Sequence, residues 1–227
     1  NSISEKTAAV IIEPIQGEGG IREVPRQCLE GLRKICDENN CLLIFDEVQC
    51  GMGRTGKLFA YEWSEVNPDI MTIAKAIGNG FPLGACLTSK KVGEKMDFGS
   101  HGSTFGGNPL ACTVGNAVLD IMLKDKFFIE INVVAKKLYE GLQNVITDFP
   151  SVIENIRGRG FILGLKCQVE NDKFVNLARE KYILTVKASD NVVRLLPPIN
   201  LTLTECDEAL DKIRAVSYTH LTLPTTD

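Results

Sequence analysis

Short apolar runs alternate with stretches of helical periodicity through the first half of the chain, and this alternation limits the fold more than any other feature. The runs cover residues 8–12 (AAVII), 42–45 (LLIF) and 70–74 (IMTIA), with a fourth expected at 84–88, and residues 25–38 carry apolar side chains at helical spacing. Strands that are apolar throughout are typical of a parallel sheet with helices on both faces and right-handed crossovers. The sequence therefore predicts an α/β fold with a mostly parallel sheet.

The second half of the sequence has a different texture. A helix is expected from Asn108, an N-cap followed by proline, and a long amphipathic stretch comes after it at 128–146. Beyond these, short strands are expected at 153–157, 161–166, 183–186 and 192–196, and helices near 172–181 and 205–216. We therefore expect a sheet domain over residues 1–125, a small α+β domain over 126–216 and a non-native tail over 217–227, whose threonine-rich sequence resembles translated adapter.

Composition excludes several classes of protein. The chain has 227 residues, 44% of them hydrophobic, and a net charge of −4, which argues against a nucleic-acid or anionic-membrane partner. No apolar run in the sequence approaches the ~18–20 residues that cross a bilayer. The eight cysteines form no CxxC pair and there are only two histidines, so a structural zinc or other metal site is not expected. A core of this size needs no disulfides, which favours reduced thiols and a cytoplasmic location.

Ionisable residues follow three of the expected strands. They are Glu13, the pair Asp46 and Glu47, and Lys75. One polar residue after a strand is usually a loop residue or a helix cap. Three strand ends that carry charges of both signs are harder to explain as separate loop residues, because they converge on one edge of the sheet. Ligands of open α/β sheets bind beyond the carboxyl ends of the strands. The sequence therefore predicts an active site at this edge.

A carboxylate and an amine across one cleft are what pyridoxal 5′-phosphate requires. A lysine amine forms a Schiff base with its aldehyde, and the ring withdraws electrons only while its nitrogen stays protonated, which a neighbouring aspartate ensures. The phosphate needs backbone N–H groups and hydroxyls. Residues 101–109 (HGSTFGGNP) supply small and hydroxyl side chains just before a helix N-terminus, although such a run is also an ordinary capping turn.

Five strings of the sequence resemble the class III aminotransferases, pyridoxal-phosphate enzymes of fold type I (aspartate aminotransferase-like). They are IIEPIQGEGG (11–20), LIFDEVQCGMGRTGKLFA (43–60), PDIMTIAKAIGNGFPLGA (68–85), HGSTFGGNPLA (101–111) and VVRLLPP (192–198). The likeness runs in order through residues 8–215 and is greatest to the ornithine and acetylornithine branch. It implies part of the large domain of that fold, followed by its small C-terminal domain.

The resemblance also implies roles for cofactor-binding residues. Lys75 matches the lysine that binds the cofactor covalently and then shuttles a proton, Asp46 the partner of the pyridine nitrogen, and Gln49 the partner of the phenolic oxygen. Ser103 and Thr104 match a loop that reaches the cofactor phosphate of a neighbouring subunit. The resemblance therefore implies a homodimer.

Two further residues match substrate-binding positions. Arg194 matches an arginine that binds a substrate carboxylate. Glu13 matches a glutamate residue that pairs with this arginine until the substrate glutamate enters and takes its place. The implied reaction converts N-acetylornithine and 2-oxoglutarate into N-acetylglutamate semialdehyde and glutamate, as in arginine biosynthesis. Ornithine, succinyldiaminopimelate and 4-aminobutyrate are the alternative amino donors.

Residues 51–56 (GMGRTG) fit the dinucleotide fingerprint G-x-G-x-x-G, so an NAD-dependent oxidoreductase is one rival interpretation. The first glycine lies five residues after Asp46, and two carboxylates would repel a pyrophosphate, so a loop near the active site is preferred. A non-catalytic fragment is the other rival. Family members carry an N-terminal portion with a phosphate-binding loop, a stacking aromatic and a second arginine that no residue here matches. We expect the chain alone to be weakly active and prone to aggregation, because sheet edges would be uncovered.

Overall fold

The chain divides into two compact units. The computed structural model describes residues 3–222. The N-terminal unit comprises Asn1–Pro14 and Val24–Phe127, and the C-terminal unit comprises Ile15–Glu23 and Phe128–Asp227. The segment Ile15–Glu23 thus belongs with residues far along the sequence, and the expected division near residue 125 did not set it apart.

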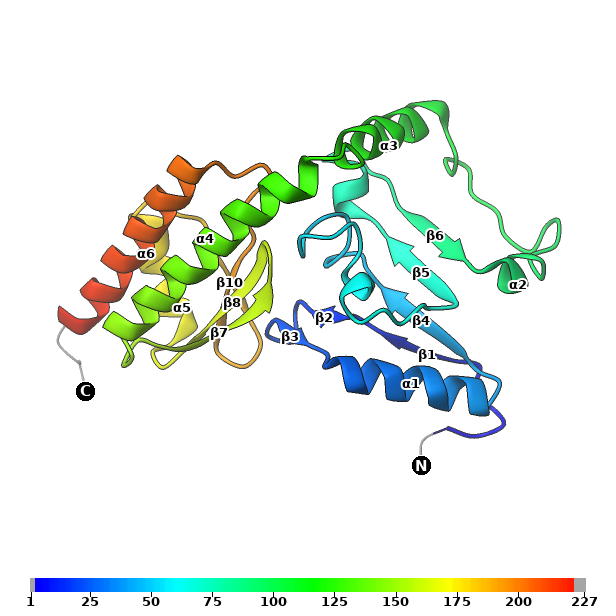
Figure 1. The fold of residues 1–227 in the computed structure, drawn as a ribbon, viewed down its shortest axis with the longest axis horizontal. Coiled ribbons are helices and arrows are strands. Elements are labelled where there is room, and N and C mark those ends of the chain that lie inside the picture. Colours follow the sequence, from blue (N-terminus) through cyan, green and yellow to red (C-terminus); the bar gives the residue numbers. More distant parts are fainter. Residues whose placement is uncertain (1–2, 223–227) are drawn as a thin grey trace. The chain divides into compact units, whose positions relative to one another are not determined.

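The N-terminal unit is built on a four-stranded sheet. Its order is β1 (Ala9–Ile12), β4 (Leu42–Asp46), β5 (Ile70–Ile73) and β6 (Ala85–Thr88). The first three strands are parallel, and β6 runs antiparallel to β5 (Figure 1). This confirms the predicted α/β fold with a mostly parallel sheet, since the continuous apolar runs are its strands.

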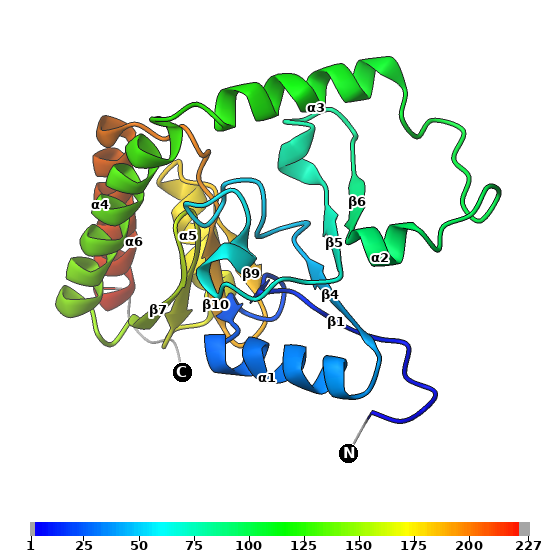
Figure 2. The same ribbon diagram turned by 45° about the vertical axis from the view of Figure 1, so that its right-hand side comes forward.

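Helix α1 (Arg26–Glu38) lies along β1 and β4 (Figure 2). Its apolar face contributes to a core made of Leu29, Cys36, Cys41, Leu43, Phe45 and Val66. Each large side chain buried in this way contributes about 1.5–3 kcal/mol relative to an exposed position. This packing fixes β4, and with it the residues at the end of that strand.

The remaining helices of this unit are short, apart from α3. They are η1 (Ala60–Trp63), η2 (Lys75–Ile77), α2 (Lys90–Gly93) and α3 (Pro109–Met122). As predicted, α3 begins after Asn108, whose side chain accepts a 2.9 Å hydrogen bond from the Ala111 N–H. This bond satisfies one of the N–H groups that a helix start leaves open.

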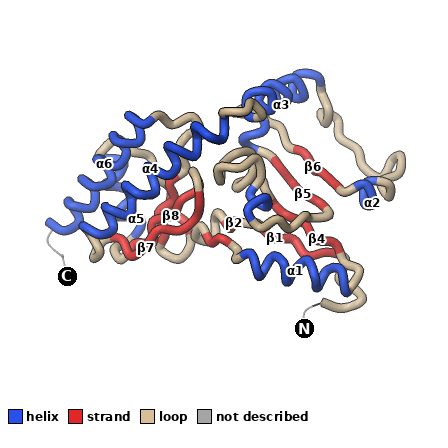
Figure 3. Tube along the Cα trace, in the orientation of Figure 1, coloured by secondary structure: helices blue, strands red, loops and turns tan. Residues whose placement is uncertain are grey.

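The C-terminal unit has an antiparallel sheet of its own. Its strands are β7 (Ile153–Arg159), β8 (Ile162–Cys167), β10 (Val192–Leu195) and β9 (Val186–Ala188), in that spatial order. Figure 3 shows β7 and β8 side by side. Helices α4 (Phe127–Asp148), α5 (Asn171–Glu180) and α6 (Leu203–Thr222) accompany it, together with a hairpin of β2 (Ile15–Gln16) and β3 (Arg22–Glu23).

Two expectations for this unit differ from the structure. The strand expected at 183–186 begins at Val186, because Tyr182 has a left-handed backbone and Leu184 is 86% exposed, so neither supports a buried strand. Helix α6 continues into the expected tail as far as Thr222, and Ser217 is fully buried. The rest of that expected tail, residues 223–227, lies outside the described residues. Whether the tail is native stays a prediction.

Within residues 3–222, no helix is long and apolar enough to cross a membrane. No disulfide joins any of the eight cysteines, all of which fall in the described part of the chain.

Candidate active site

Asp46 and Lys75 lie at the same edge of the N-terminal sheet. Asp46 ends β4, and Lys75 follows β5 after a single alanine. The two strands are parallel neighbours with Asp46 opposite Thr72, so their carboxyl ends meet about 4.8 Å apart in the sheet. The expected carboxylate and amine therefore project from adjacent strand ends.

The Asp46 carboxylate is fixed through one oxygen. Its Oδ1 accepts hydrogen bonds from the Val48 N–H at 2.9 Å and from the Thr72 hydroxyl at 3.2 Å. No residue in the described range donates to the second oxygen, Oδ2. The side chain thus has a defined orientation and one oxygen left to bind a cationic N–H. Sequence analysis missed Thr72, although a hydroxyl in an otherwise apolar strand was a weak signal.

Lys75 has a backbone conformation that side chains rarely adopt. Its φ is +50°, in the left-handed region, and it starts the short helix η2. Such strain costs on the order of 1–3 kcal/mol and is concentrated at functional sites. The turn that follows is tight, since a Cβ on Gly78 would lie 2.0 Å from the Phe81 carbonyl oxygen. The chain therefore leaves the sheet abruptly at the lysine.

Glu47 has a role distinct from that of its neighbour Asp46. It is 1% exposed and accepts backbone hydrogen bonds from Ala60 at 2.8 Å and Tyr61 at 2.7 Å, and a third from the Cys50 thiol at 3.5 Å. Burial raises the pKa of Glu47 above its ordinary 4.5, and these hydrogen bonds partly oppose that rise. Glu47 therefore anchors the start of η1 instead of facing a ligand.

The GMGRTG run is a packed loop. Met52 is 2% exposed and Thr55 1% exposed, and the Thr55 hydroxyl accepts a 3.1 Å hydrogen bond from the Trp63 indole N–H. In the described chain between β4 and β5, the helical element is the short η1, which begins at Ala60 after the run has ended. A dinucleotide site needs a helix N-terminus opening directly from the glycines. The run therefore does not have that architecture.

Three other predicted cofactor residues also belong to the N-terminal unit. Gln49 is half-buried, three residues after Asp46. Ser103 and Thr104 are exposed in the loop before α3, where the Ser103 hydroxyl accepts a 2.8 Å hydrogen bond from the Gly106 N–H. Their expected role toward a neighbouring subunit stays a prediction.

Arg194 is buried in β10, with 7% of its surface exposed. Its Nη1 donates to Oε1 of Glu18 at 2.6 Å, and both residues belong to the C-terminal unit. The expected partner was Glu13, which lies half-buried just after β1 in the other unit. Glu18 comes from the same IIEPIQGEGG string, so the second glutamate of that string was the signal that sequence analysis passed over.

Within the N-terminal unit, Asp46 suits a protonated ring nitrogen and Lys75 an electrophilic carbonyl. Within the C-terminal unit, Arg194 suits a carboxylate. Among residues 3–222, no group of three or more His, Cys, Asp or Glu side chains could hold a metal ion.

Comparison with known proteins gives a consistent result. The family model described as aminotransferase class-III matches residues 1–216. Acetylornithine aminotransferase from Mesorhizobium japonicum is 57% identical over 215 residues, which cover 94% of this chain and 54% of that protein. The chain therefore spans about half the length of the curated relatives that it matches.

Solved structures similar to this chain are also aminotransferases. N-acetylornithine aminotransferase from Stenotrophomonas maltophilia superposes with a TM-score of 0.86 at 36% identity, covering 96% of this chain and 58% of that one. Ornithine aminotransferase from Toxoplasma gondii has a TM-score of 0.89 at 32% identity, covering 96% of this chain and 52% of that one.

Proposed function

Because the chain belongs to the class III aminotransferase family, whose members depend on pyridoxal 5′-phosphate, we propose that it is part of an N-acetylornithine:2-oxoglutarate aminotransferase. The amino group of N-acetylornithine passes to 2-oxoglutarate, giving N-acetylglutamate semialdehyde and glutamate. The choice of donor rests on the 57% identity to the Mesorhizobium acetylornithine aminotransferase. Within the proposal, the enzyme acts in arginine biosynthesis in the cytoplasm.

The residues of the N-terminal unit fit the cofactor. Oδ2 of Asp46 would accept the ring N–H, Nζ of Lys75 would be the covalent anchor, and Gln49 would bind the phenolic oxygen. Ser103 and Thr104 would reach the phosphate bound by a second subunit, so the proposed assembly is a homodimer. When bound, the cofactor withdraws electrons from the substrate carbon that carries the amine.

Asp46 and Lys75 then handle protons. The Asp46 carboxylate keeps its partner nitrogen protonated, because an opposite charge in contact raises the pKa of that nitrogen. Thr72 and Val48 hold the carboxylate in place while it does so. The Lys75 amine, when it is not bound to the cofactor, would act as the general base and acid that takes a proton from the substrate carbon bearing the amine and gives it back.

Within the proposal, Arg194 and Glu18 give the enzyme two substrate modes. While Glu18 pairs with Arg194, the guanidinium binds no substrate carboxylate. The donor then presents its ω-amine to the cofactor. When 2-oxoglutarate enters, Arg194 leaves Glu18 and binds the incoming α-carboxylate with two parallel hydrogen bonds. The 2.6 Å ion pair between Arg194 and Glu18 supports Glu18 in the role expected of Glu13. Glu13 stays a predicted substrate-site residue at the end of β1.

Borohydride reduction tests the central assignment. The cofactor-loaded enzyme is reduced, digested and mapped by mass spectrometry, and we expect the pyridoxyl adduct on Lys75. Lys75→Arg should abolish the adduct, whereas Lys90→Arg on the exposed helix α2 should leave it in place. An adduct on any other lysine overturns the proposal.

A comparison of four amines tests which one is the amino donor. The rate at which the cofactor band bleaches is compared for N-acetylornithine, ornithine, succinyldiaminopimelate and 4-aminobutyrate, and 2-oxoglutarate should restore the band. We expect N-acetylornithine to be fastest. A faster reaction with another amine reassigns the enzyme within its family.

A further inference from the structure

Asp190 connects several segments of the C-terminal unit. It lies in the turn between β9 and β10, and its Oδ2 accepts hydrogen bonds from Arg22 at 3.0 Å and Arg157 at 2.8 Å. Its Oδ1 pairs with Lys166 at 2.9 Å. These partners come from β3, β7 and β8. One carboxylate therefore joins the hairpin to the sheet.

The turn between β9 and β10 also contacts the backbone of the loop that carries Glu18. The Ser189 N–H donates to the Glu18 carbonyl at 3.1 Å, and Arg157 donates to the Gly20 carbonyl at 3.2 Å. The approach is close, because a Cβ on Gly20, whose φ is +98°, would lie 2.7 Å from the Ser189 carbonyl oxygen. The backbone from the Glu18 carbonyl to Gly20 is thus held by Ser189, the neighbour of Asp190, and by Arg157, its ion-pair partner.

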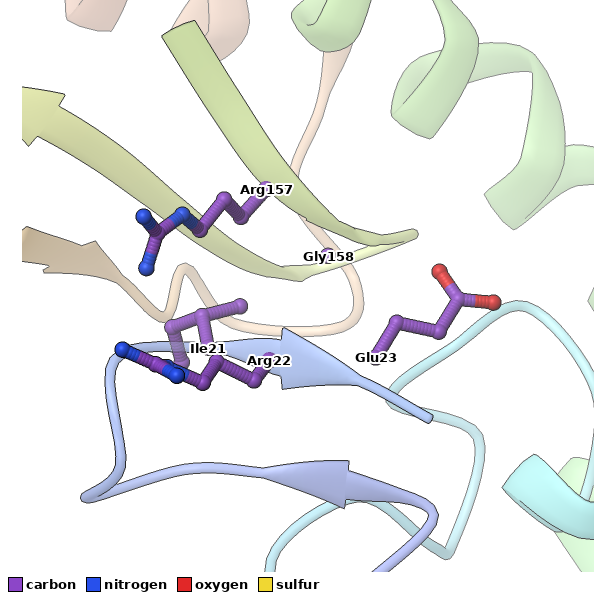
Figure 4. Close-up of a pocket in the computed structure, with 5 residues that line it drawn as sticks. All are labelled: Ile21, Arg22, Glu23, Arg157 and Gly158. Carbon is purple, nitrogen blue, oxygen red and sulfur yellow. The ribbon is translucent and has the colours of Figure 1, made fainter. Parts of the chain in front are cut away.

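Asp190 also balances a concentration of positive charge. Figure 4 shows the guanidinium groups of Arg22 and Arg157 at one end of a pocket of about 510 Å³, with Ile21 between them and Glu23 at the other end. Both arginines bond to the same Asp190 oxygen. Without that charge the two cations would repel each other and push the hairpin away from β7.

We propose that Asp190 is a positioning residue, which places Glu18 against Arg194 and so sets the balance between the two substrate modes; this inference rests on the proposed function. The Glu18 side chain is 74% exposed, so packing does not hold it on the guanidinium. Its position depends on its backbone, and that backbone is anchored through the turn. Loss of the Asp190 charge should free Glu18 and weaken the mode in which Arg194 is covered.

Asp190→Asn tests the charge alone. Asp190 has a φ of +61°, and asparagine tolerates this conformation as readily as aspartate, so the turn is kept. Hydrogen bonds from Lys166 and Arg157 hold the pKa of Asp190 well below its usual range. The carboxylate is therefore ionised throughout the pH range of an assay, and the substitution removes a full charge.

The experiment measures both half-reactions in the cofactor-loaded enzyme. For D190N we expect the KM for N-acetylornithine to rise about fivefold, the KM for 2-oxoglutarate to stay level or fall, and amide exchange in residues 17–22 to quicken. Asp172→Asn is the matched control, since Asp172 makes an exposed 2.9 Å ion pair with Lys187 on β9 and not with a residue of the hairpin. It should change none of the three.

Glu18→Gln separates the two possible failures. If E18Q shifts the substrate balance and D190N does not, the positioning role is wrong and the proposed function stands. If E18Q leaves both KM values unchanged, the Glu18 switch fails, and the positioning role with it. Equal changes in both KM values for D190N also overturn the role. Should D190N fail to fold, Arg22→Gln, which removes one arm of the cluster, decides by the same criteria.

Discussion

At the scale of single residues, Thr72 shows how a neutral side chain can matter to a charged one. Its hydroxyl donates to Asp46 from the adjacent strand, where the two residues are register partners. A carboxylate that is held through one oxygen presents the other in a constant direction. The orientation of Asp46 therefore depends on a residue that need not touch a ligand.

Thr72→Val should loosen cofactor binding. The isosteric change removes a hydrogen bond to a charged group, worth about 1.5–3 kcal/mol, so we expect the dissociation constant for pyridoxal phosphate to rise on the order of tenfold or more. Absorbance titration measures it. Thr147→Val, which removes a hydroxyl bonded to the Gln143 carbonyl on α4, is the control and should have no effect. An unchanged constant for T72V would exclude the orienting role.

Glu47→Gln should destabilise the fold in a pH-dependent way. The Ala60 and Tyr61 N–H groups each donate to a different carboxylate oxygen, and glutamine keeps only one acceptor oxygen. One N–H would then face an NH2 donor, so the free energy of unfolding should fall by about 1–3 kcal/mol. Because burial raises the folded pKa above the ordinary 4.5, the stability from Glu47 is fully present below that pH and is lost as pH rises through the folded value. Urea unfolding should thus show the wild-type advantage growing toward pH 4.5. A constant or shrinking advantage would contradict this.

At the scale of elements, the turn between β2 and β3 depends on a glycine. Gly20→Ala combines an unfavourable φ with a 2.7 Å contact to the Ser189 oxygen. Gly80→Ala is the control for backbone strain, since Gly80 has a φ of +100° with nothing within 4 Å of its added Cβ. We expect G20A to lower the free energy of unfolding by about 1–3 kcal/mol more than G80A does. Equal losses in the free energy of unfolding for G20A and G80A would show that the backbone at Gly20 can move away from Ser189.

The elements that sequence analysis predicted well are those with strong local signals. The apolar strands β4 and β5, helix α1 and the Asn108 cap all follow from residues adjacent in sequence. The Arg194–Glu18 pair does not, because its members are 176 residues apart. With two glutamates in one string, spacing alone could not choose between Glu13 and Glu18. Thr72 was missed for a related reason, since its partner is on another strand.

At the scale of the whole molecule, the N-terminal sheet has exposed apolar residues at both edges. Ile11 on β1 is 64% exposed and Leu87 on β6 is 39% exposed. Edge strands of this kind can pair with other chains. The predicted weak activity of the isolated chain stays a prediction, to be measured by transamination assay, and full-rate turnover would contradict it.

Self-association of the isolated 227-residue chain should respond to a charge on this edge. Ile11→Lys should reduce light scattering at equal concentration, because a lysine on an edge strand opposes pairing. Gln143→Lys adds the same charge on the exposed surface of α4 and should have a smaller effect. Equal effects would point to net charge instead of the edge.

The membership of Ile15–Glu23 in the C-terminal unit has a consequence for biosynthesis. Gly20 leaves the ribosome long before its partner Arg157, which is 137 residues later. At translation rates of ~5–20 residues per second, the nascent hairpin waits roughly seven to twenty-seven seconds for the strands that receive it. During that interval Ile21, which is fully buried in the folded protein, has no native site to enter, so this apolar side chain is available to a chaperone on the emerging polypeptide.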